Sequence, residues 1–133
     1  MKEFHLQIVT PDGLAFDGNA ESLLVRTFSG DVEILAMHAD LFSSMAIGRV
    51  RIKTDGKILF GSSSGGFLSV ESGEVKLICT TFEFKDDIDL ARAKAAKEKA
   101  EAMLKNAKTD EEIEIAKAKL SRAHSRINVA LLK

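Results

Sequence analysis

Two arginines near the end of the chain have a spacing that suits the binding of an anion. Arg122 and Arg126 are four residues apart in a stretch that we expect to be helical, so both side chains project from one face. If this helix runs antiparallel to an earlier one, the pair lies near the start of that earlier helix, where Asp89 and Arg92 are found. Three guanidiniums would then converge, and guanidinium forks suit phosphate oxygens. The alternative is an ordinary solvated helix face.

The other residues of catalytic or metal-binding type form no recognisable site. None of the histidines, His5, His38 and His124, has another His, Cys or carboxylate at metal-ligand spacing, so we expect no metal. The SSSGG stretch at 62–66 lacks the phosphate-loop pattern, and no neighbouring base would activate its serines. We interpret it as a tight loop between strands. The sequence therefore predicts neither a catalytic residue nor a required cofactor.

The composition is typical of a soluble globular protein. Of the 133 residues, 45% are hydrophobic and 29% charged, and the formal net charge is −1, which argues against nucleic acid as a partner. No stretch approaches the roughly 20 apolar residues of a membrane helix, and the N-terminus lacks the apolar core of a signal peptide. We expect a cytosolic protein with at most an indirect membrane link. The lone Cys79 alternates with Val75 and Leu77, which indicates a buried thiol.

The chain changes character after residue 84. Every Gly, the only Pro and all eight Phe precede that point, whereas Ala, Lys and Glu dominate afterwards. Residues 1–84 carry 7 Lys or Arg against 11 Asp or Glu, and residues 85–133 carry 12 against 9. We therefore predict two units, an acidic body over 1–84 and a basic tail over 85–133.

The body is predicted to consist of short β-strands. Phe4, Leu6 and Ile8 alternate with polar residues, as in a strand with one buried face. Asp55-Gly56 and Ser72-Gly73 are signals for two-residue hairpin turns, whose central residues need positive φ. Further strands are expected at Leu14–Phe16, Ser22–Thr27, Val32–Leu35 and around Ile47, separated by Gly18, Ser29-Gly30 and Ser62–Gly66. Turns at such short intervals predict an antiparallel sandwich or barrel.

The tail is predicted to be an antiparallel helical hairpin. Asp86, Asp87 and Asp89 suit a helix N-terminus, and Thr109 with Glu112 has the spacing of a capping box. The apolar stripes are Ala93, Ala96, Ala100, Met103/Leu104 and Ala107, then Ile113, Ala116, Leu120, Ala123, Ile127 and Ala130/Leu131. A buried alanine methyl contributes only about 0.8 kcal/mol, so contacts built on this face are weak. The hairpin could therefore change its docking, although a permanently packed hairpin fits the same pattern.

A series of short motifs runs along nearly the whole chain: IVTPDG at 8–13, SGDVEIL at 29–35, GRVRI at 48–52, SGGFLSV at 64–70, DIDLARAKAA at 87–96 and LSRAHSRINVA at 120–130. Together and in this order they resemble the ε subunit of bacterial F-type ATP synthase. The resemblance implies an α+β fold, in which a ten-stranded antiparallel β-sandwich is followed by a two-helix hairpin. It also implies a place in the central stalk of the rotor, peripheral to the cytoplasmic face of the cell membrane.

The resemblance implies partners as well. In that family the sandwich binds the γ subunit and the c-ring, which makes Ser29, Gly30, Asp31 and the loop near His38 candidate rotor contacts. The helices fold onto the sandwich or extend along γ towards the α and β subunits, where they inhibit ATP hydrolysis. The stretch ILAMHADLF at 34–42 departs from the family's usual LPGHAPLL, so we expect this loop to make a different contact.

Family members that bind ATP on the folded hairpin carry an I/L-D-x-x-R-A motif. It is present here, and the resemblance implies that ATP is a regulatory ligand held by Glu83, Ile88, Asp89, Arg92, Ala93, Lys99, Arg122 and Arg126. Lys99 stands where ATP-binding members can have arginine, which keeps the charge and loses the bidentate fork. The alternative functions are a stand-alone nucleotide-sensing module and, more remotely, a small sandwich enzyme.

Overall fold

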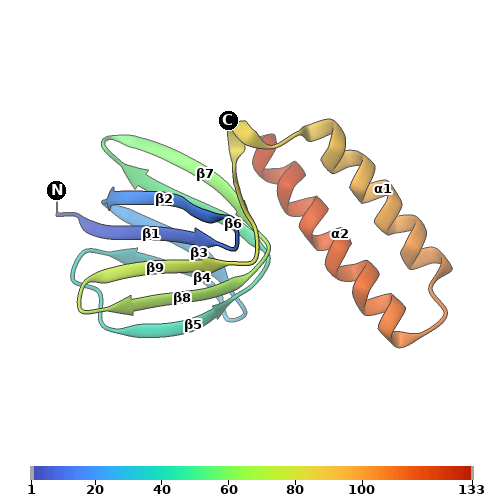
Figure 1. Ribbon diagram of the computed structural model, residues 1–133, viewed down its shortest axis with the longest axis horizontal. Coiled ribbons are helices and arrows are strands. Elements are labelled where there is room, and N and C mark those ends of the chain that lie inside the picture. The colour runs from blue at the N-terminus through green and yellow to red at the C-terminus, as the bar shows by residue number, and fades with distance from the viewer. Residues whose placement is uncertain (1, 133) are drawn as a thin grey trace.

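The structure is a computed structural model that describes residues 2–132 as a β-body with a helical hairpin beside it (Figure 1). The strands are β1 (Phe4–Thr10), β2 (Gly13–Ala20), β3 (Ser22–Thr27), β4 (Gly30–Leu35), β5 (Leu41–Met45), β6 (Gly48–Thr54), β7 (Lys57–Ser63), β8 (Gly66–Glu71), β9 (Glu74–Cys79) and β10 (Phe82–Phe84). A 3₁₀ turn, η1 (Lys85–Asp87), leads into α1 (Leu90–Asn106) and α2 (Asp110–Ala130).

The strands form two layers that are continuous at one edge. One layer has the strand order β10-β7-β6-β3, and β4 pairs with β3 on the edge away from β6. The other layer has the order β5-β8-β9-β1-β2. A single residue pair, Thr27 with Met45, joins β3 to β5 and so links the layers. The expectation of an antiparallel sandwich is confirmed except at β1 and β9, which pair in parallel. The alternation of side chains sets which face is buried and does not set strand direction, so the sequence could not reveal this pair.

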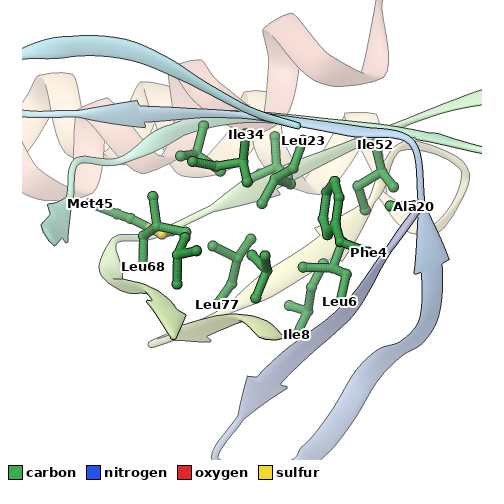
Figure 2. Close-up of a cluster of buried hydrophobic side chains, with 14 of the residues drawn as sticks. Phe4, Leu6, Ile8, Ala20, Leu23, Ile34, Met45, Ile52, Leu68 and Leu77 are labelled. Atoms are coloured by element: carbon green, nitrogen blue, oxygen red, sulfur yellow. The ribbon is translucent and has the colours of Figure 1, made fainter. Parts of the chain in front are cut away.

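The core lies between the two layers. Figure 2 shows Leu23, Ile34 and Ile52 from the first layer facing Leu68 and Leu77 from the second. The predicted inward residues of the first and ninth strands are buried, as expected from their alternation: Phe4, Leu6, Ile8, Val75, Leu77 and Cys79. The predicted hairpin turns are confirmed by positive φ at Asp55, Gly56, Ser72 and Gly73.

Three local predictions in the body were wrong. Ile47 lies in the connection after β5, and the strand itself is Leu41–Met45. Its alternation was concealed because Phe42 lies on the exposed face while Ser43 is half-buried. Gly18 does not separate strands but pairs with Leu6 inside β2. The serine-rich loop is limited to residues 64–65, because Ser62 and Ser63 continue β7 by pairing with β10.

Both helices begin at the predicted caps. The Asp89 carboxylate accepts a hydrogen bond from the Arg92 amide at 3.0 Å, and the Thr109 hydroxyl accepts one from the Glu112 amide at 3.1 Å. The Glu112 carboxylate in turn accepts from the amide of Lys108 at 2.9 Å. The bonds to Asp89 and Thr109 satisfy a free amide in the first turn of each helix, and the bond from Lys108 satisfies the amide that precedes the Thr109 cap.

The two helices pack along a seam of small residues. Ala93 and Ala100 of α1 and Ala116 and Ala123 of α2 are all buried, which confirms the predicted alanine interface. Two residues assigned to the stripes are exposed. Ala96 lies at a hollow between the helices and the body, and Leu131 is 59% exposed just after α2 ends.

Candidate functional site

The last turns of α2 attach the hairpin to the body. α2 lies against β6, β7 and η1. The hydroxyls of Ser62 and Ser125 are 2.7 Å apart, and Arg126 Nε donates to Glu83 Oε1 at 2.7 Å. Ser62 and Glu83 are opposite each other across β7 and β10, and their partners are consecutive on α2. We call these two contacts the latch.

A hollow of about 490 Å³ lies between η1, the start of α1 and the latch. Six of the eight predicted ATP-site residues line it: Glu83, Ile88, Asp89, Arg92, Ala93 and Arg126. Its other charged lining residues are Asp12 and Asp87, so it presents four carboxylates against two guanidiniums. We call this the acidic hollow.

A smaller hollow of about 150 Å³ lies further along the helices and contains the other two predicted residues, Lys99 and Arg122. Lys119 and Arg126 also line it, and its lining includes no carboxylate from residues 2–132. We call this the basic hollow. Ala96 and Arg126 line both hollows, so the acidic and basic hollows are neighbours in one junction.

The predicted convergence of three guanidiniums was wrong in detail. Arg92 lines the acidic hollow and Arg122 the basic one, and Arg126 alone reaches both. Arg126 shares both hollows with Ala96, whereas Arg122 shares only the basic hollow with Lys99 and Ala100. Lys119 was missed, although its position three residues before Arg122 puts it on the same helix face.

The predicted rotor contacts lie apart. Ser29 lies in the turn before β4 and Gly30 is the first residue of that strand, whereas His38 lies in the loop after it. The six residues of β4 separate these ends by about 20 Å. At the first end the Asp31 carboxylate accepts from Arg26 Nε at 2.7 Å, and at the other His38 Nδ1 is 2.7 Å from the carbonyl of Ala39.

A row of apolar side chains crosses the outer face of the second layer. The strand register places Phe67 opposite Ile78, Ile78 opposite Val9, and Val9 opposite Leu14. Phe42 extends the row, since its ring stacks on that of Phe67 with centroids 5.4 Å apart. The exposed fractions are 67% for Phe42, 44% for Phe67, 43% for Ile78 and 59% for Leu14. These side chains therefore form an exposed apolar patch on the surface.

We call these five residues the apolar row. Sequence reasoning missed it because the row exists only once the register of five strands is fixed. The available signal was a large apolar residue between two inward-facing ones, as with Ile78 between Leu77 and Cys79.

A histidine held between two carboxylates lies on the same outer face as the apolar row. His5 Nε2 is 2.5 Å from Asp17 Oδ1, and His5 Nδ1 is 2.6 Å from Glu74 Oε2. The hydrogen bond to Asp17, followed by that to Glu74, raises the pKa of His5, and the bond to His5 lowers the pKa of Asp17. The carboxylates contact opposite ring nitrogens, so the three groups cannot ligate one ion through this ring.

Comparison with known protein families gives two adjacent matches. Residues 3–85 match the family described as ATP synthase, Delta/Epsilon chain, beta-sandwich domain, and residues 86–130 match the long alpha-helix domain of the same chain. The ATP synthase epsilon chain of Halalkalibacterium halodurans is 37% identical over 132 residues, and that of Bacillus velezensis is 40% identical over 130. Each alignment covers 98% of both chains.

Two solved structures share the fold. A chain of the Euglena gracilis mitochondrial ATP synthase, in its OSCP/F1/c-ring assembly, superposes with a TM-score of 0.83 at 21% identity and covers 98% of this chain and 82% of that one. A chain of the Tetrahymena thermophila central stalk/c-ring assembly gives 0.71 at 11% identity, with 97% of each chain covered. Within residues 2–132, neither helix combines the length and apolarity needed to span a bilayer.

The His5 cluster predicts a pH-dependent contribution to stability. Because the folded-state pKa of His5 lies above its ordinary value of 6.5, the contribution is complete below about pH 6.5 and is lost as pH rises through the raised pKa. His5→Gln should therefore destabilise the protein at pH 5.5 and have less effect at pH 9, measured by urea unfolding. His38→Gln is the control, since that ring contacts a backbone carbonyl. Equal effects of His5→Gln at both pH values would contradict the assignment.

Proposed function

Because this chain belongs to the ATP synthase delta/epsilon chain family, we propose that it is a non-catalytic subunit of the central rotor of an F-type ATP synthase. The support is the full-length alignment with bacterial proteins named ATP synthase epsilon chain. In this role the chain meets the cell membrane only through the complex, at its cytoplasmic face. Family membership favours this role over a stand-alone nucleotide-sensing module.

The apolar row is the surface best suited to the γ subunit. It is exposed, apolar and spread over five strands, so a stable partner would remove it from water. The loop containing His38 leads directly into β5, where Phe42 lies, and Met37 in that loop is 80% exposed. The His38 loop and the apolar row thus form one continuous contact for γ. We assign the turn at Ser29–Asp31, at the opposite end of β4, as the contact for the c-ring.

Replacing the aromatic centre of the apolar row should weaken γ binding. Phe42→Ser/Phe67→Ser removes two stacked rings, and we expect the dissociation constant for purified γ to rise at least about 30-fold, which corresponds to about 2 kcal/mol. The matched control is Ile58→Ser, which removes an apolar side chain of similar exposure from the other layer. If the double variant bound γ with wild-type affinity and had an unchanged circular dichroism spectrum, the apolar row would not be the γ contact.

The two hollows together suit ATP as a regulatory ligand. The cationic groups of Lys99, Lys119 and Arg122 make the basic hollow suitable for the β- and γ-phosphates. The acidic hollow, at about 490 Å³, falls within the usual size range of ligand sites and would hold the uncharged base and ribose. Arg126 lies between them, where it pairs with Glu83.

Calorimetry tests the nucleotide site. Wild-type chain should bind ATP with saturable heat and AMP more weakly, because AMP leaves the basic hollow empty. Arg122→Ala/Arg126→Ala should abolish measurable binding, whereas Arg122→Ala alone weakens it and keeps the latch. Lys117→Ala, which removes an exposed cation of α2 outside both hollows, should bind like wild type. Absence of ATP binding by the wild-type chain would remove the nucleotide part of the proposal.

The hairpin is proposed to act as a movable inhibitor of ATP hydrolysis. Its helices share an alanine seam, and α2 holds it to the body through a small contact. ATP at 100 times its dissociation constant would stabilise the docked pose by about 2.7 kcal/mol. Moving a two-state equilibrium from 1:99 to 99:1 needs about 5.5 kcal/mol. ATP would therefore shift the docked population without fixing it.

Removing the hairpin tests the inhibitory role. A complex assembled with a chain lacking residues 88–133 should hydrolyse ATP faster than the wild-type complex, because the inhibitory element is gone. The truncated chain should still co-purify with γ and the c-ring, since the proposed contacts all lie in the body. Unchanged hydrolysis in a fully assembled complex would contradict the inhibitory role and leave the rotor role standing.

A further inference from the structure

A groove of about 490 Å³ lies on the side of α2 opposite to the nucleotide hollows. Its floor is the outer face of β3, β4 and β6, and its wall is the last turns of α2. Leu24, Ile47 and Val129 give it an apolar base. Gly48 allows the backbone to approach Arg26 closely, because a Cβ at this position would come within 2.9 Å of the Arg26 side chain. The boundary between two units of a fold is a frequent place for ligand sites.

Among residues 2–132, guanidinium groups outnumber carboxylates in the lining of this groove. Arg26 uses Nε for its bond to Asp31, which leaves the terminal nitrogens of its guanidinium available. Arg49 lies over the Phe60 ring at 5.8 Å, and no carboxylate of residues 2–132 is within 4.0 Å of its side-chain nitrogens. His124 and Asn128 face them from α2, and among residues 2–132 Asp31 is the only carboxylate in the lining.

We propose that this groove binds a small organic anion, in which a phosphate or carboxylate group is attached to an apolar body. The anionic group would bind between Arg26, Arg49 and His124, and the apolar part would cover Leu24 and Val129. This site is separate from the acidic and basic hollows. It goes beyond the rotor role and requires only that the hairpin is docked.

The groove links its ligand to the position of the hairpin. One wall belongs to α2 and the floor to the body, so the complete site exists only in the docked pose. A ligand that binds only this pose stabilises it by mass action. By reciprocity, the groove ligand and ATP would each increase the affinity of the chain for the other.

Titration of the full-length chain with phenyl phosphate tests the proposal. At constant ionic strength, backbone amide NMR signals of Ser121, His124 and Asn128 should shift saturably. Phenol has only the apolar ring and inorganic phosphate has only the anionic group, so each should bind more weakly than phenyl phosphate. Arg49→Gln/His124→Gln should weaken phenyl phosphate binding at least roughly tenfold, since a guanidinium and an imidazole partner are lost.

The matched control is Arg51→Gln/His38→Gln, which makes the same changes outside the groove and should bind like wild type. Arg122→Ala should weaken ATP binding and leave phenyl phosphate binding intact. Shifts that do not saturate, or equal affinity in the groove variant and the wild type, would overturn the proposal. If phenyl phosphate binds while ATP does not, the groove stands and only the nucleotide site fails.

Discussion

The contact between the end of α2 and the outer face of β6 and β7 is the constraint on which the rest of the structure depends. Two polar contacts form its latch, Ser62 with Ser125 and Glu83 with Arg126. Both Glu83 and Arg126 are partly exposed, and ion pairs in such positions contribute little to stability. The seam between the helices is alanine, which adds little apolar area per residue. The hairpin is therefore well defined and weakly held.

This single contact also defines the candidate binding sites. The acidic hollow lies on one side of α2, the groove lies on the other, and both lose a wall when α2 leaves the body. Any ligand of either site acts on the docking equilibrium, to the extent that it prefers the docked pose. None of the five residues of the apolar row lines either site. The acidic hollow includes Thr10 and Asp12 at the β1–β2 turn, and the groove includes Asp31 of the turn proposed for the c-ring, so the ligand sites adjoin the proposed rotor contacts.

Local chemistry made much of this fold predictable. Positive φ at Asp55-Gly56 and the caps at Asp89 and Thr109 depend on a few neighbouring residues, and all were found from the sequence. Features that depend on how distant segments align could not be predicted from the sequence. The parallel pairing of β1 with β9, the apolar row and the separation of Arg92 from Arg122 arise from how distant segments align, and the pattern within a single strand or helix does not fix that alignment.

A disulfide across the latch tests most directly whether the hairpin must move. The Ser62 and Ser125 hydroxyls are 2.7 Å apart, so Ser62→Cys/Ser125→Cys should form a bond that locks the docked pose, and the native Cys79 is buried. In an assembled complex we predict fast ATP hydrolysis when the bond is oxidised and slower hydrolysis after reduction. Equal rates in the two states, with the cross-link verified, would show that release of the hairpin plays no part in inhibition.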